Sequence, residues 1–174
     1  MNTFALEKLY QGDKCTFYTV KSLETDDEPS ETEKFLAKFE NDERLSDALT
    51  ELTTLLFNVI GDRDGALESD YFRQERKTKA LPKGVTDFEE IVLDFRDFPL
   101  RLYCLWFSEK LVILFNGEEK TSQAAQEGKT SWFFYEAERY ANRILKAMQE
   151  KEIYISEDDT TFRNMHNDDD EIIL

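Results

Sequence analysis

The chain has 174 residues and a mass of 20.5 kDa, a size at which one hydrophobic core buries about 70% of the unfolded surface. We therefore expect a single domain over residues 1–174. Hydrophobic residues supply 40% of the sequence, which is a globular composition, and 38 Asp and Glu against 22 Lys and Arg give a formal net charge of −16. This charge argues against a surface that binds nucleic acid or anionic membranes over its whole extent.

Cysteine content and hydropathy indicate the cellular compartment. Cys15 and Cys104 lie in apolar runs, and two cysteines in a chain of this length form neither a disulfide framework nor a zinc-binding pattern. We expect both to be buried free thiols. The N-terminus lacks a basic start followed by an apolar stretch, and no run of about 18 apolar residues occurs. These features predict a soluble cytoplasmic protein without membrane association.

The first third of the chain contains one expected strand and two expected helices. Apolar residues in 15–22 predict a strand with one well-buried face. Residues 24–33 hold six carboxylates and a proline, which is typical of a solvated acidic loop. Ser30 and Glu33 form an S-x-x-E capping box that opens a short helix. Leucines and other apolar residues at three- and four-residue steps predict a second helix over 45–60.

The remainder of the chain reads as a sheet followed by a helix. The apolar runs at 90–95, 101–107 and 110–115 predict strands, and the last two form an antiparallel hairpin at the centre of the sheet. A third amphipathic helix begins near residue 132, a last strand or hairpin follows it, and residues 164–174 look like a frayed acidic tail. The expected fold is α+β, with two N-terminal helices and one C-terminal helix packed on a small, mostly antiparallel sheet.

Several kinds of catalytic site have no counterpart in the sequence. The sequence has no phosphate-binding glycine loop, no G-x-S-x-G, no H-E-x-x-H and no calcium loop. The single histidine, His166, belongs to the acidic tail, so general acid–base work would depend on a carboxylate, a tyrosine or a perturbed lysine. We expect no metal site and no small-molecule cofactor.

One sizeable basic cluster interrupts this acidic chain, and its cations are Arg73, Arg76, Lys77, Lys79 and Lys83. Two further cations, Arg101 and Lys120, should lie at the same end of the predicted hairpin. Together such residues can bind phosphates and stabilise the charge that develops during RNA cleavage without histidine. The alternative is that they form exposed salt bridges with the abundant carboxylates.

The segment RLYCLWFSEKLVILFNGEEKTSQAAQ, with the later helix containing YANRILKAM, resembles the RelE/ParE toxin superfamily, nearest to the HigB-like toxins of bacterial toxin–antitoxin systems. The resemblance covers roughly residues 30–150. Arg101-Leu102-Tyr103 matches the arginine-bearing strand of the family, and Lys120-Thr121 matches the basic segment after the next strand. Ala141 to Arg143 corresponds to the family's A-x-x-[RK] helix, with its alanine and arginine one residue closer together.

The resemblance implies a toxin that cleaves mRNA, free or on the ribosome, without a metal, and that has a cognate antitoxin as its partner. Arg101 and Lys120 would be the catalytic residues. Substrate binding would fall to Tyr135 and to the cations of residues 73–83.

Departures from the family pattern leave other functions open. Val92 and Asp94 stand where ribonuclease members carry lysines, and Ala137 stands at the place of the helix tyrosine, with Tyr135 near. An aspartate in that place repels a phosphate. A non-catalytic member of the fold would bind a partner protein, and an acidic phage or mobile-element protein would mimic nucleic acid or bind a basic partner.

Overall fold

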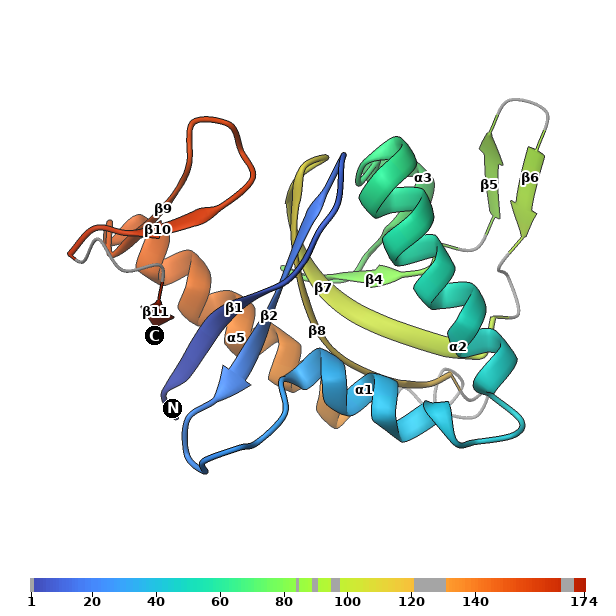
Figure 1. Ribbon diagram of the computed structural model, residues 1–174, viewed down its shortest axis with the longest axis horizontal. Helices are drawn as coiled ribbons and strands as arrows, with labels where there is room; N and C mark the ends of the chain where they lie inside the picture. Colours follow the sequence, from blue (N-terminus) through green and yellow to red (C-terminus); the bar gives the residue numbers. More distant parts are fainter. Residues whose placement is uncertain (1, 84, 89–90, 95–97, 121–130, 167–170) are drawn as a thin grey trace.

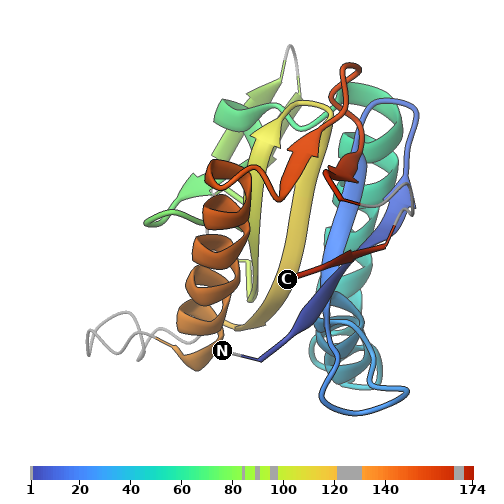
Figure 2. The same cartoon turned by 90° about the vertical axis from the view of Figure 1, so that its left-hand side faces the viewer.

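A mixed seven-stranded sheet forms the middle layer of the molecule (Figures 1 and 2). The computed structural model describes residues 2–83, 85–88, 91–94, 98–120, 131–166 and 171–174. Across the sheet the strands are β11 (Ile172–Ile173), β1 (Phe4–Gln11), β2 (Thr16–Ser22), β8 (Leu111–Glu119), β7 (Leu100–Ser108), β4 (Lys79–Leu81) and β3 (Arg73–Gln74). Neighbouring strands are antiparallel except β2 and β8, which are parallel.

The N-terminal helices cover one face of the sheet (Figure 2). They are α1 (Glu31–Glu40), α2 (Ser46–Thr53), the π-helix η1 (Thr54–Asp64) that continues α2, and the short α3 (Glu68–Tyr71). Ser30 and Glu33 make the predicted capping box at the start of α1. The apolar stripe of the second helix is buried at Leu52, Leu56 and Ile60, so the predicted helix is confirmed, with its second half wound as a π-helix.

A single helix and the C-terminal hairpin cover the other face (Figure 2). Helix α5 (Trp132–Gln149) buries Phe134, Ala137, Ala141, Ile144 and Ala147 against the sheet. Strands β9 (Ile153–Ile155) and β10 (Phe162–Asn164) pair as the predicted hairpin. The predicted α+β architecture, with N-terminal helices and one C-terminal helix packed on a mostly antiparallel sheet, is thereby confirmed. None of the described helices has the length and apolarity that a bilayer span requires.

The prediction for residues 90–95 is wrong in one respect. Strand β6 (Ile91–Asp94) pairs with β5 (Val85–Phe88) in a separate two-stranded sheet, away from the central sheet in Figure 1. The place beside β7 belongs to β4 instead. Ala80 and Leu81 of β4 are buried there, so the apolar contacts at this edge of β7 come from a short strand in a stretch that the sequence pattern leaves irregular.

Two predicted boundaries also need correction. The tail is ordered at its end, because β11 pairs with β1 and Ile172, 1% exposed, joins the core below α5. Residues 167–170 of the predicted tail lie outside the described residues. The acidic loop ends at Ser30, since Glu31 already belongs to α1.

Both cysteines are buried thiols, as predicted. Burial raises the pKa of Cys15 to about 12 and also raises the pKa of Cys104. Neither side chain is therefore a ready nucleophile at neutral pH.

Candidate functional site

The two predicted catalytic cations lie at the same end of the β7–β8 pair. Arg101 stands opposite Glu118 in the register of the two strands. Lys120 follows β8 directly, and its backbone N–H donates to the carbonyl of Pro99 at 2.6 Å. The predicted proximity along the sheet is confirmed, but a carboxylate occupies the position across from Arg101.

A buried tyrosine connects Arg101 to that carboxylate. Tyr103, 2% exposed, donates its hydroxyl hydrogen to Glu118 at 2.8 Å. Burial raises the pKa of Tyr103 and the negative charge of Glu118 adds to the increase, while hydrogen bonds with Ser131 and Arg101 oppose it. Arg101 is thus part of a hydrogen-bonded group around Tyr103 that also contains Glu118 and Ser131.

Part of the basic cluster packs against α5 near this group. The Arg76 guanidinium lies 5.7 Å from the centroid of the Phe134 ring. The Phe134 ring also contacts Tyr103, at 5.7 Å between centroids, and the exposed Tyr135, at 5.8 Å. Lys77 donates from Nζ to Asn142 Oδ1 at 2.5 Å. Arg76 and Tyr135 therefore both contact the Phe134 ring.

The other cations of the cluster have partners elsewhere. Arg73 pairs with Glu75 beside it on the chain. Lys79 forms an ion pair with Glu68 at 2.7 Å. Lys83 donates from Nζ to the carbonyl oxygen of Ser69 at 2.5 Å.

Strand alternation separates Lys79 from Arg101. Cys104 packs toward α1 and α2, whereas Tyr103 packs toward α5. Lys79 pairs with Cys104 in the register of β4 and β7, and Arg101 shares the strand parity of Tyr103. The two cations consequently lie on opposite faces of the sheet, so the cluster does not line one surface.

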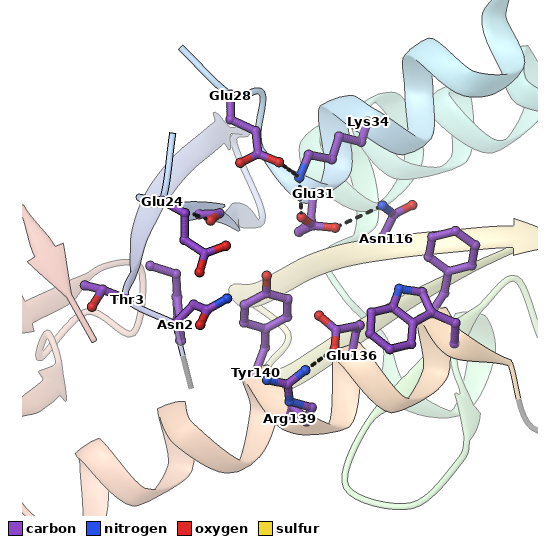
Figure 3. A pocket seen from close by; sticks show the side chains of 14 residues that line it. Asn2, Thr3, Glu24, Glu28, Glu31, Lys34, Asn116, Glu136, Arg139 and Tyr140 are labelled. Carbon is purple, nitrogen blue, oxygen red and sulfur yellow. Dashed lines mark hydrogen bonds and ion pairs between the residues drawn. The ribbon is translucent and has the colours of Figure 1, made fainter. Parts of the chain in front are cut away.

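A pocket that the sequence did not indicate lies between α1 and α5 (Figure 3). Its volume is about 420 Å³. We call it the α1–α5 pocket; its charged lining residues are Glu24, Glu28, Glu31, Glu136, Lys34 and Arg139. Four carboxylates against two cations leave an excess of two negative charges. Trp132, Phe133 and Tyr140 supply aromatic walls.

The cations of this pocket are already engaged with its carboxylates. Lys34 Nζ lies 2.5 Å from Glu28 and 2.8 Å from Glu31. Hydrogen bonds from Lys34 are the main reason that the pKa of Glu28 is lowered. Arg139 pairs with Glu136. Because one lysine serves two carboxylates, the negative excess remains on the α1 side of the pocket.

Tyr140 is held so that its hydroxyl points into the pocket (Figure 3). Its ring makes an edge contact with Phe4 at 4.9 Å and stacks on Phe115 at 5.9 Å, both between centroids. Burial raises the pKa of Tyr140 to about 12, with Glu31 and Glu136 adding to the increase. The hydroxyl is therefore neutral at physiological pH and can donate or accept a hydrogen bond.

The sequence does not predict this pocket, because segments that are far apart in the chain form it. Its lining comes from residues 2–4 at the start of the chain, from 22–34, from Asn116 and from the first half of α5. The one motif in these segments, the capping box of Ser30 and Glu33, predicts a helix start and not a binding site, and 24–33 reads as a solvated loop. The structure adds what the sequence lacks, because Trp132 in the pocket wall is 66% exposed, a large exposed fraction for a tryptophan.

Neither region is arranged for a metal ion. Within the described ranges, no three His, Cys, Asp or Glu side chains are placed to hold one.

Comparisons with protein-family models, with curated proteins and with solved structures give no match to this chain. The fold itself defines the class, an α+β protein with a mixed sheet between two helical layers. Because nothing matches, the RelE/ParE resemblance stays a prediction.

Proposed function

We propose that this chain is a non-catalytic binding protein whose acidic surface engages a basic partner protein. The observation that supports this most strongly is that carboxylates of the chain itself lie beside two of the cations expected to bind phosphate. Arg101 lies across from Glu118, and Lys79 is paired with Glu68. A carboxylate beside a cation cancels most of its attraction for phosphate.

The net charge favours the same function. On a chain with a formal charge of −16, an RNA site needs a focused positive patch that overcomes the surrounding negative field. The predicted cations are divided between the two faces of the sheet instead. The same field attracts a basic polypeptide and accelerates its association.

The proposal is tested by capture and reconstitution. The chain is immobilised at low salt, host extract treated with nuclease is passed over it, and each retained polypeptide is purified and mixed again with the free chain. We expect a basic polypeptide, with a pI above about 9, that forms a complex of defined mass by light scattering. Its binding should weaken at least about tenfold when NaCl is raised from about 50 to about 300 mM. Retention of RNA alone, or of no partner that rebinds, would contradict the proposal.

A metal-free RNA endonuclease of a toxin–antitoxin system is the second candidate. The observation in its favour is that Arg101 and Lys120 share one end of the β7–β8 pair, with Arg76 and Tyr135 nearby around Phe134. In that case Arg101 and Lys120 would stabilise the charge on the scissile phosphate. Tyr135 and the cations of 73–83 would bind the mRNA, and an antitoxin would neutralise the protein.

Induced expression in a bacterial host separates the two candidates. Protein synthesis is followed by label incorporation in cells that express the chain, Arg101→Ala, or Arg44→Ala, whose arginine is 68% exposed in surface ion pairs. A binding protein without catalysis leaves translation unchanged in all three strains at equal levels of folded protein. Rapid loss of translation that Arg101→Ala abolishes and Arg44→Ala retains would favour the endonuclease.

A further inference from the structure

We propose that the α1–α5 pocket binds an arginine side chain of the partner polypeptide. The inference rests on the proposed function, because it assumes that the partner is a basic protein. It assigns the contact to one place and one side-chain chemistry. The pocket is separate from the Arg101 group, since neither Arg101 nor Tyr103 lines it.

The carboxylates of the pocket leave a place for one more cation. Lys34 is shared between Glu28 and Glu31, and no side-chain cation is paired with Glu24 among the described residues. Glu24 lines the pocket from the loop before α1, with its carboxylate on the same side as the Tyr140 hydroxyl (Figure 3). The excess negative charge of the pocket would repel an anionic ligand and attract a cationic one.

The aromatic wall favours a guanidinium over a simple ammonium. Trp132, which is 66% exposed, lines the pocket, and Tyr135 lies one turn further along α5. A tryptophan face is the best aromatic partner for a cation. A guanidinium stacks on such a ring while its five N–H donors reach carboxylates and hydroxyls in one plane. Glu24 and Tyr140 offer a carboxylate and a neutral hydroxyl, and Trp132, eight residues before Tyr140 on α5, offers a stacking face in the wall of the same pocket.

The size of the pocket fits a side chain that arrives with its polypeptide. A volume of about 420 Å³ falls in the range of about 300–1,000 Å³ that is usual for small-molecule sites. This leaves room for an arginine side chain and the adjoining backbone. Exposed aromatics next to such a pocket are typical of protein interfaces, in which Trp and Tyr are enriched.

The first test uses an acetylated and amidated tri-arginine peptide as the probe, with tri-citrulline as the neutral isostere. The two tryptophans of the chain give separate indole N–H resonances. We expect the resonance of Trp132 to shift with tri-arginine and not with tri-citrulline. Trp106, whose indole N–H donates to the carbonyl of Ala66 at 2.8 Å, serves as the internal reference. An unshifted Trp132, or an equal shift with tri-lysine, would overturn the assignment to arginine.

Variants then connect the pocket to the partner. Glu24→Gln and Trp132→Leu should each weaken tri-arginine binding about two- to fivefold, the size expected for one partly exposed ion pair or stacking contact. Glu51→Gln removes an exposed carboxylate of α2 and should leave binding unchanged. Equal weakening by Glu51→Gln would reduce the effect to net charge and overturn the site.

Failure of the inference and failure of the proposed function give different results. If the reconstituted partner binds the double variant Glu24→Gln/Trp132→Leu as tightly as the parent chain, the pocket assignment is overturned and the binding function stands. If no basic partner rebinds while tri-arginine still shifts Trp132, the proposed function is overturned and the pocket remains an arginine site.

Discussion

The Glu138 carboxylate of α5 holds the buried Thr78 of the β3–β4 turn through two hydrogen bonds. Its Oε1 accepts hydrogen bonds from the backbone N–H of Thr78 at 2.9 Å and from the Thr78 hydroxyl at 2.7 Å. Thr78 is fully buried in the turn between β3 and β4. Glu138 therefore satisfies two buried donors of the turn that carries Arg76 and Lys77, in addition to the contacts of those two side chains with α5.

Glu138→Ala should lower the free energy of unfolding by about 1–3 kcal/mol, because both Thr78 donors lose their acceptor in a buried place. Urea denaturation measures the loss. Glu138→Gln keeps a carbonyl oxygen at the same place and should cost clearly less. Glu150→Ala, at the exposed end of α5, should change stability by no more than about 0.5 kcal/mol. Equal losses for the Ala and Gln variants would show that charge, not the hydrogen bonds, matters at this position.

The two isoleucines of β11 make a matched pair. Ile172 is 1% exposed in the core below α5, and Ile173 is 48% exposed on the opposite side of the strand. Ile172→Ala should cost about 2 kcal/mol or more, the range for removing a buried aliphatic side chain, whereas Ile173→Ala should stay within about 0.5 kcal/mol. Thermal unfolding compares them. Similar small effects for both would mean that β11 does not pair with β1 in solution.

The capping box of α1 makes a helix start sensitive to pH. The Glu33 carboxylate accepts hydrogen bonds from the Ser30 backbone N–H and hydroxyl, both at 2.8 Å. These bonds lower the pKa of Glu33 below its usual value of 4.5. A carboxyl whose folded pKa is lowered stabilises the fold above its unfolded pKa, and this contribution is lost as the pH falls toward the folded value.

Glu33→Gln should therefore be less stable than the parent chain at pH 7, and the difference should shrink as the pH falls below about 4.5. Urea unfolding at pH 7, 5 and 3.5 measures it. Glu40→Gln neutralises an exposed carboxylate at the other end of the same helix, where the helix dipole disfavours negative charge. We expect no loss of stability for that variant. A Glu33→Gln difference that is independent of pH would contradict the role of the charge.

At the scale of elements, the sequence predicts what depends on local periodicity. The helices at 45–60 and 132–149 follow from apolar residues at helical spacing, and the hairpin of β7 and β8 follows from two apolar runs joined by a tight turn. The strand that pairs with the other edge of β7, which is β4, cannot be predicted from such a pattern. Strand β4 has three residues within an irregular stretch, and its pairing is decided by contacts with residues about 25 positions later in the chain.

At the scale of the whole molecule, the expected site and the observed one differ for a physical reason. A run of cations in the sequence predicts one basic surface, yet the alternation of strands places Lys79 and Arg101 on opposite faces. The α1–α5 pocket brings together carboxylates that are remote in sequence, such as Glu24 and Glu136. Contacts between segments far apart in the sequence form the α1–α5 pocket and separate the cations of the basic cluster. Patterns within a single sequence do not encode such contacts.

The charge of the whole chain gives a last prediction. With a formal charge of −16, the folded state carries repulsion that the expanded chain relieves. Raising NaCl from about 0.01 to about 0.15 M shortens the screening length from about 30 to about 8 Å. We expect the melting temperature to rise, by about 2–4 °C for each kcal/mol of repulsion removed. Calorimetry measures it, and KCl should act equally if screening is the cause.

Added salt should therefore raise the melting temperature of the free chain and lower its affinity for a basic partner. Screening stabilises the free chain by weakening its self-repulsion, and it weakens the complex with a basic partner by reducing their attraction. A melting temperature that falls with added salt would mean that ion pairs such as Lys34 with Glu28 and Glu31 outweigh the net charge. In that case the negative field would be too weak to select a partner by charge, and binding would depend on the α1–α5 pocket and its aromatic wall alone.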